Sequence, residues 1–199
     1  MNNIRINYIG DSHSVLTFGQ TILPELEKVA SVHFLAFSGM KLQFLTEWWE
    51  QKHEIQISNF EKVPGQEKVQ TKDPDLVGNS FQFHTADYLI IALGTNDIVE
   101  CVGNGGVFKK SIQPRISGQL RKVRQRKVIF VEPPLLEIDK NQNIRKQILS
   151  EVKALDFAIL SHGGHHADQT DGIHMKKEMA AKFGEYISKE LLKLILPHH

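Results

Sequence analysis

The sequence is short of several features that would assign it to a specialised class. It has one cysteine, Cys101, so no internal disulfide can form and a reducing compartment is expected. Its 24 basic and 23 acidic residues give a net charge of +1, which offers no positive surface for nucleic acid or an anionic membrane. No apolar run approaches the roughly 18 residues that a membrane span requires. What remains is a globular chain whose 199 residues suit a single domain, residues 1–199.

The N-terminus also lacks targeting features. An extended pattern begins almost at once, without the apolar stretch or the small-residue cleavage site of a secretory signal. We therefore expect a cytoplasmic protein without stable membrane insertion and without a nucleic-acid partner.

Short apolar runs alternate with helical patterns along the chain. The strongest is residues 88–93, a continuous apolar run of the kind found in parallel strands covered on both faces. Proline–glycine and similar turn signals make residues 54–80 an irregular excursion, with a short strand at 54–58. The alternation predicts a three-layer α/β/α fold with a parallel sheet of about five strands. The other expected strands are 4–9, 31–37, 127–131 and 156–161, and the expected helices are 16–29, 41–52, 107–124, 141–155 and 175–194.

Chemically useful residues follow the predicted strands. The first strand leads into Gly10-Asp11-Ser12-His13, the second into Gly39, and the third into Gly94-Thr95-Asn96-Asp97. Asp171-Gly172-Ile173-His174 lies between the last strand and the last helix. Because ligand sites in open parallel sheets form at the carboxyl ends of the strands, we expect these segments to converge.

The converging residues are those that acyl transfer requires. Ser12, at the start of a helix, is the candidate nucleophile, and His174 is the candidate general base. Asp171 lies three residues before His174, close enough to orient it and to stabilise its protonated form. The Asn96 side chain and the backbone N–H groups of Gly39 and Ser12 can donate to an oxyanion. The neighbouring Asp11 and Asp97 are expected to accept hydrogen bonds from loop N–H groups.

With these motifs in this order, the chain resembles the SGNH (GDSL-type) hydrolases, a family of esterases and lipases with a flavodoxin-like three-layer fold. The likeness runs from residue 8 through the helix after residue 174. It implies a catalytic triad of Ser12, Asp171 and His174, an oxyanion hole of Ser12, Gly39 and Asn96, and no cofactor or metal. His13 stands where the family has leucine, and it is similar to variants associated with bacterial carbohydrate O-acyl chemistry.

Other candidate features have simpler explanations. The histidines of residues 162–168 match no standard zinc spacing, and a polar loop that carries His174 into the site is the better interpretation. Adjacent residues on a helix face different ways, so at most one of Trp48 and Trp49 is expected on a sugar- or acyl-contacting surface. The basic residues 121–127 are typical of a solvated helix end, and Cys101 is a bystander thiol.

The prediction is a serine ester hydrolase that acts through an acyl-enzyme on short acyl (acetyl) esters of carbohydrates or other small molecules. One alternative is lysophospholipase or thioesterase action on longer acyl chains, with residues 54–80 supplying an acyl tunnel. Transfer of the acyl group to a sugar instead of water would share the first chemical step. A non-catalytic binding module that keeps the fold is the alternative from another class.

Overall fold

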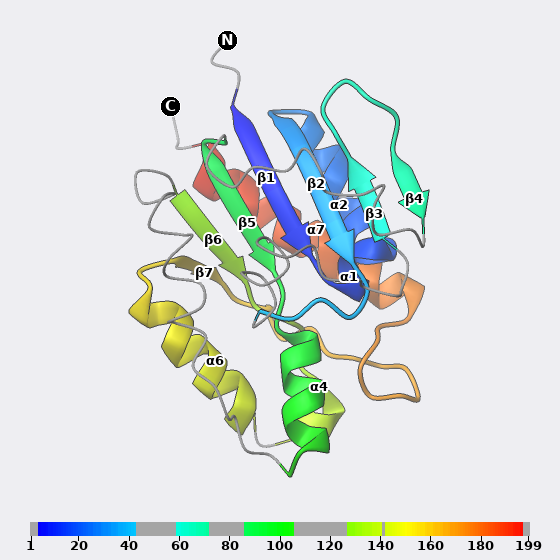
Figure 1. The fold of residues 1–199 in the computed structure, drawn as a ribbon, viewed down its shortest axis with the longest axis vertical. Coiled ribbons are helices and arrows are strands. Elements are labelled where there is room, and N and C mark those ends of the chain that lie inside the picture. The colour runs from blue at the N-terminus through cyan, green and yellow to red at the C-terminus, as the bar shows by residue number, and fades with distance from the viewer. Residues whose placement is uncertain (1–3, 43–58, 72–85, 106–126, 141, 197–199) are drawn as a thin grey trace.

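The computed structural model describes residues 4–42, 59–71, 86–105, 127–140 and 142–196 (Figure 1). The helices expected at 41–52 and 107–124 lie almost wholly outside these residues. The strand expected at 54–58 and the Trp48–Trp49 pair lie entirely outside them. In chain order the elements are β1 (Arg5–Gly10), α1 (Ser12–Val15), α2 (Thr17–Glu27), β2 (Ser31–Phe37), β3 (Asn59–Lys62), β4 (Val69–Thr71), β5 (Tyr88–Ala92), α4 (Thr95–Gly103), β6 (Lys127–Val131), the 3-10 turn η4 (Glu137–Asp139), α6 (Asn143–Ala154), β7 (Ala158–Leu160) and α7 (Lys177–Ile195).

The strands form one sheet in the order β4-β3-β2-β1-β5-β6-β7 (Figure 1). Five neighbouring strands, β2, β1, β5, β6 and β7, are parallel, as the sequence predicts. Their order is that of flavodoxin-like sheets. Strand β1 is central, with Gly10 opposite Ala36 of β2 and Ala92 of β5. The next strand in the chain, β2, lies on one side of β1, and the later strand β5 lies on its other side. A ligand crevice is expected where the strand order reverses in this way.

The prediction of irregular structure between the strand expected at 54–58 and residue 80 is wrong for two segments, 59–62 and 69–71. Strand β3 pairs antiparallel with β2, and β4 pairs antiparallel with β3. The proline–glycine turn signal is in the right place, since Gly65 has a φ of 75° and Gln66 N–H bonds Val63 O between these strands. The strands themselves are short and polar, so what holds them is pairing against the edge of β2, which a periodicity argument does not detect.

Each face of the sheet is covered by its own helices. Successive side chains of a strand point to opposite faces, so β1, β2, β5 and β6 supply two separate apolar clusters. Helices α1, α2 and α7 pack on one face, through residues such as Phe18 and Phe183. Helices α4 and α6 pack on the other face, through residues such as Ile98 and Ile148. The result is the three-layer α/β/α architecture.

Helix α4 has no counterpart among the expected helices. It begins directly after Gly94, which has a φ of 123°, and it buries Ile98 and Cys101 against the sheet. Helix α2 runs through Pro24, which is exposed, so the proline does not end the helix. Helix α7 is the longest of the described helices. None of them, in the ranges given above, has the length and apolarity that crossing a bilayer requires.

The turn after β1 is tightly built. Asp11 caps α1 by accepting a hydrogen bond from His13 N–H at 3.1 Å. The hydroxyls of Tyr8 and Ser14 lie 2.8 Å apart beneath this turn. A Cβ atom on Gly10 would lie 2.0 Å from Ser14 Oγ, so only glycine fits there. This packing fixes where Ser12 emerges from the sheet.

We expect Gly10→Ala to destabilise the protein by about 1–3 kcal/mol, because the added methyl group overlaps Ser14 in a packed interior. Urea unfolding followed by circular dichroism measures this loss. Gly103→Ala is the matched control, since nothing lies within 4 Å of a Cβ at that exposed helical position. That variant should be neutral or slightly stabilised. Equal stability of the two variants would contradict the packing argument.

Candidate active site

Three side chains from two distant parts of the chain meet at the carboxyl edge of the sheet. Ser12 Oγ lies 3.4 Å from Nε2 of His174, and Nδ1 of His174 lies 2.7 Å from Oδ2 of Asp171. Ser12 is at the start of α1, and the other two residues are in the connection between β7 and α7. A long first contact is common in sites without substrate. The arrangement is a continuous path from hydroxyl to imidazole to carboxylate.

Asp171 is held as a carboxylate. One of its oxygens accepts hydrogen bonds from the backbone N–H groups of Ile173 and His174, both at 2.9 Å, and the other faces the His174 ring. These bonds, foremost those from His174, lower the pKa of Asp171 to about 2. The ionised carboxylate places the ring proton of His174 on Nδ1, which leaves Nε2 as an acceptor toward the Ser12 hydroxyl. This is the tautomer that a general base needs.

The loop that carries His174 is anchored to its neighbours. The backbone N–H groups of Asp168 and Gln169 donate to His174 O at 3.2 and 3.1 Å. Glu137 N–H donates to Gly172 O at 3.2 Å, which joins this loop to the segment that follows β6. Gly172 has a φ of 66°, a conformation that glycine adopts without strain. The loop that carries His174 is therefore fixed by backbone bonds on both sides.

The turn after β2 is tied to helix α4. Asn96 Nδ2 donates to Met40 O at 3.0 Å, and the Asp97 carboxylate accepts from Leu42 N–H at 2.9 Å. Lys41 and Glu100 add an ion pair at 3.0 Å. Gly39, in this turn, has a φ of 78°. An amide has two N–H donors, so Asn96 can position the turn with one and keep the other for an oxyanion.

Asp11 is a buried acid next to Ser12 in the chain. Its side chain is 2% exposed, and burial is the main reason that its pKa rises to about 7. Hydrogen bonds from His13 N–H and from the Thr95 side chain partly offset the effect of burial. The carboxylates of Asp11 and Asp97 both accept loop N–H groups, as expected from the sequence, and each connects two of the motifs.

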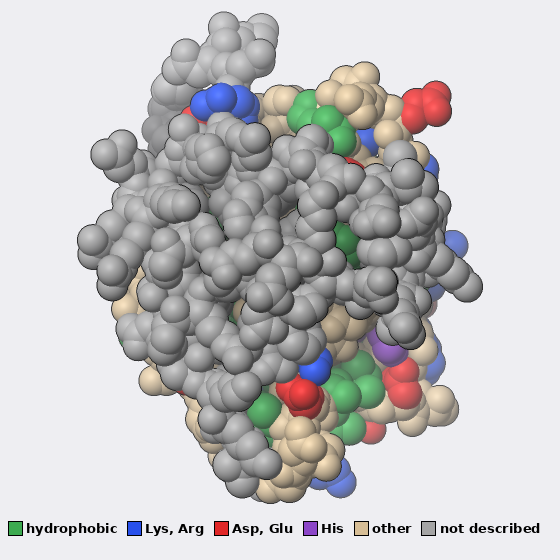
Figure 2. Space-filling model, viewed as in Figure 1, with side chains coloured by type: hydrophobic (Ala, Val, Ile, Leu, Met, Phe, Trp, Pro, Cys, Tyr) green, Lys and Arg blue, Asp and Glu red, His purple; other side chains and the backbone are tan. Residues whose placement is uncertain are grey.

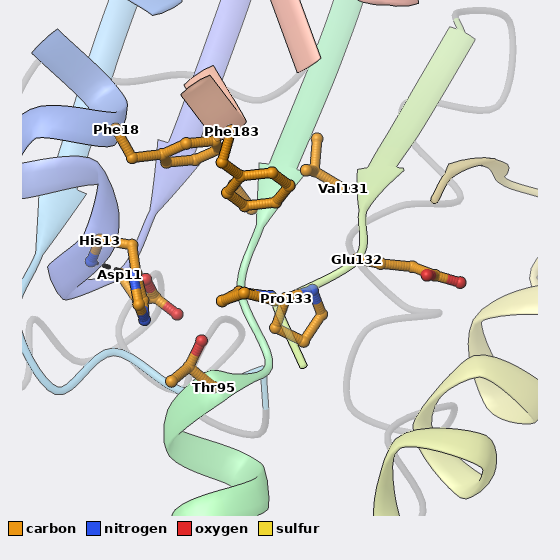
Figure 3. Close-up of a pocket in the computed structure, with 10 residues that line it drawn as sticks. Asp11, His13, Phe18, Thr95, Val131, Glu132, Pro133 and Phe183 are labelled. Atoms are coloured by element: carbon orange, nitrogen blue, oxygen red, sulfur yellow. Dashed lines mark hydrogen bonds between the residues drawn. The ribbon is translucent and has the colours of Figure 1, made fainter. Parts of the chain in front are cut away.

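A pocket of the described residues lies at the carboxyl ends of β1, β5 and β6 (Figure 3). Figure 3 shows Asp11 and His13 on one side of it, Thr95 below them, and Pro133 across from them. Phe183 of α7 closes the apolar end. The pocket therefore combines a polar wall, made by the residues that flank Ser12 in the chain and by Thr95, with mainly apolar walls elsewhere. Its full lining is Asp11, His13, Phe18, Ala92, Thr95, Val131, Glu132, Pro133, Pro134 and Phe183.

The histidines of residues 162–168 have structural contacts. His162 N–H donates to Glu132 Oε2 at 3.3 Å, and the His165 ring packs beside Phe183 and Tyr186, with ring centroids 5.2 and 5.4 Å apart. Within the described part of the chain, no group of three or more metal-ligating side chains is arranged to hold an ion.

The sequence pattern does not predict the contacts of two further residues near the site. Arg145 of α6 is buried and donates to the carbonyls of Pro133 and Pro134 in the pocket wall. His13 is 5% exposed, and its ring centroid lies 5.5 Å from that of His174. His13 stands out in the sequence only as a departure from the family's leucine, and no spacing rule or motif predicts that either residue is buried here.

Comparison with known proteins gives a likeness of structure. No family model matches the chain, and no curated protein matches it. A GDSL-like lipase from Bacteroides thetaiotaomicron superposes with a TM-score of 0.59 at 13% identity, covering 96% of this chain and 89% of that one. A member of the lipolytic G-D-S-L family from Veillonella parvula gives 0.54 at 11% identity, covering 96% and 98%. A family two carbohydrate esterase from Cellvibrio japonicus gives 0.58 at 16% identity, covering 96% and 61%.

These similarities establish the fold. The chain has the α/β/α architecture of the GDSL (SGNH) hydrolases, the architecture predicted from its motifs. At such low identity the structural likeness does not transfer an activity, which has to be argued from the site itself.

If Asn96 is an oxyanion donor, Asn96→Ala should lower the turnover number for an ester by about a hundredfold. The Km should change little, because the lost bond strengthens only in the transition state. The fold should survive, because Asn96 is half-buried and loses one bond, to Met40 O. Steady-state kinetics with a p-nitrophenyl ester, alongside a thermal melt, measure both effects. Turnover within a few-fold of wild type would remove Asn96 from the oxyanion hole.

Asp11 should make the stability of the protein fall as the pH rises. Its pKa is about 7 in the folded protein against 3.8 ordinarily, so the folded state binds more protons than the unfolded state between these values. Its stabilising contribution is complete below about pH 3.8 and is lost as the pH rises through 7.

Asp11→Asn mimics the protonated acid and tests this expectation. Urea unfolding of wild type and variant is measured at intervals from pH 4 to 8. The unfolding free energy of wild type should fall relative to that of the variant up to about pH 7 and then stay level. A difference in unfolding free energy that stays constant across this range would show that Asp11 ionises normally.

Proposed function

We propose that the protein is a serine ester hydrolase with Ser12 as nucleophile, His174 as general base and Asp171 as the residue that orients the base. The observation that carries the proposal is the unbroken hydrogen-bonded path from Ser12 Oγ through His174 to Asp171. It lies at the edge of the sheet where open α/β folds bind ligands. The same residue types in the same chemical order perform acyl transfer on unrelated folds.

In the acylation step, Ser12 Oγ attacks the ester carbonyl carbon while its proton passes to Nε2 of His174. The carbonyl oxygen gains negative charge and accepts hydrogen bonds from Ser12 N–H, Gly39 N–H and Asn96 Nδ2. The Asp171 carboxylate stabilises the imidazolium that forms. The carbon–oxygen bond to the alcohol then breaks, and the alcohol leaves with the proton from His174.

Deacylation repeats the chemistry with water. His174 takes a proton from the water as its oxygen attacks the acyl-enzyme carbonyl, and the same donors stabilise the oxyanion. The bond to Ser12 breaks, Ser12 recovers its proton from His174, and the free acid departs. Because the bond to Asp171 holds the ring proton of His174 on Nδ1, Nε2 is the atom that accepts the proton in both half-reactions.

Short acyl esters, such as acetyl groups on carbohydrates, are the proposed substrate class. The pocket lined by Asp11 and His13, which flank Ser12 in the chain, is walled by bulky apolar side chains (Phe18, Phe183) and two prolines, which agrees with a small acyl group. One structural neighbour is a carbohydrate esterase, which agrees with this choice. Longer acyl chains, an acceptor sugar in place of water, and binding without turnover are the competing outcomes of the test below.

Hydrolysis of p-nitrophenyl acetate, butyrate and octanoate should depend on Ser12, since it supplies the attacking oxygen. Ser12→Ala should reduce the rate to the uncatalysed background without lowering the melting temperature. Ser31→Ala is the control, because Ser31 is at the amino end of β2, the opposite edge of the sheet. Acetate should be the best of the three esters.

Other outcomes of the same assay are equally informative. A preference for octanoate would indicate a lipid-type substrate. Product that forms only with an added sugar would indicate acyl transfer. Activity retained by Ser12→Ala would contradict the proposed nucleophile.

A further inference from the structure

His13 is an uncommon residue in its position. It follows Ser12 in α1 but faces the interior, where its side chain lines the pocket beside Asp11 (Figure 3). Its Nε2 atom is fully enclosed and has no hydrogen-bond partner among the described residues. A buried polar atom without a partner costs stability, and such atoms call for an explanation beyond packing.

The neighbours of the His13 ring come mainly from the loop that carries His174. The His13 ring is tilted by 35° against the ring of His174 at a centroid distance of 5.5 Å. The backbone of Ile173 lies within polar contact of the His13 ring, and Asp171 lies close enough to act on its charge. From the helix that carries Ser12, His13 thus lies against the 171–174 turn.

The ring of His13 is neutral at the pH of catalysis. Burial, followed by the charge of His174, lowers its pKa to about 4. On the other walls of the pocket, α2 and α7 contribute the uncharged side chains of Phe18 and Phe183, which do not act on the charge of His13. The Glu132 side chain points away from His13 in Figure 3, toward its contacts with Arg145 and His162. A neutral imidazole can therefore lie beside His174 without opposing the positive charge that His174 gains during the reaction.

We propose that His13 is a positioning residue that holds the Asp171–His174 turn at the correct distance from Ser12. This inference rests on the proposed esterase function. Because His13 is the residue next to Ser12, its contacts with Ile173 and His174 link the position of the base directly to that of the nucleophile. A displacement of about 1 Å between reacting groups can cost a hundredfold in rate, so one contact of this kind has kinetic weight.

The test compares His13→Leu, His13→Asn and His13→Gln with wild type. Leucine has a similar volume and no polar atom, so it keeps the packing and removes the polar contact with Ile173. We expect His13→Leu to lower kcat for p-nitrophenyl acetate by about ten- to a hundredfold with Km unchanged. Its melting temperature should be equal to or above that of wild type, because the unpartnered nitrogen is gone.

The amide variants separate positioning from packing. Each places a neutral N–H near the position of one ring nitrogen of His13, so one of them should recover part of the lost kcat and thereby identify the nitrogen that contacts the turn. His166→Leu removes an exposed imidazole from the same region and is the control, with wild-type kcat expected.

Three results would overturn the proposal. The first is wild-type kcat in His13→Leu. The second is a loss of kcat that accompanies a lower melting temperature and is not recovered by either amide, which would indicate a structural role alone. The third is a wild-type protein that hydrolyses no ester at all, which would remove the esterase function and the role of His13 together. Only this last result also counts against Ser12 as nucleophile.

Discussion

The site depends on the hydrogen bond between Asp171 and the Nδ1 atom of His174. The Asp171 carboxylate accepts this bond together with two backbone N–H groups of its own turn, so the anion is stabilised where it is needed and the turn is closed around it. The same bond fixes the tautomer of His174 and directs its Nε2 toward Ser12. Without it, Ser12 would be an ordinary hydroxyl at the start of a short helix.

The parallel sheet supplies the second constraint, which is the convergence of distant segments. Strand β1 lies between β2 and β5, so the turns after all three open at one edge. Asp97 joins two of these turns by accepting Leu42 N–H, and Asp11 caps its own turn through His13 N–H and interacts with the Thr95 side chain of the next motif. Burying Asp11 has an energetic cost, visible in its raised pKa, to which the nearby Asp97 adds. The cost is offset by a rigid frame for Ser12 and the proposed oxyanion donors.

Much of this frame can be predicted from the sequence, because it rests on local patterns. Strands β2 and β6 begin and end at the predicted residues, since continuous apolar runs define them. Strands β3 and β4 were not predictable in the same way, because their polar residues pair only once β2 offers an edge. Helix α4 is not predicted either, because it begins directly after Gly94, whose local pattern is that of a turn.

The same difference applies to the site. Ser12, His174 and Asp171 can be predicted because each lies in a short motif after a predicted strand, and the structure places them within hydrogen-bond distance. The burial of His13 and the reach of Arg145 to the prolines after β6 cannot be predicted, because they depend on how separate helices pack.

The most direct test of the account is mass-spectrometric mapping of the residue that reacts with a serine-directed fluorophosphonate. Such a reagent reacts rapidly with a serine that a neighbouring base activates and much more slowly with ordinary hydroxyls. The account predicts a single adduct on the peptide that contains Ser12, formed rapidly in wild type and strongly slowed by His174→Ala. An adduct on another residue, or none in a folded sample, would contradict the assignment of Ser12 and His174 as nucleophile and base.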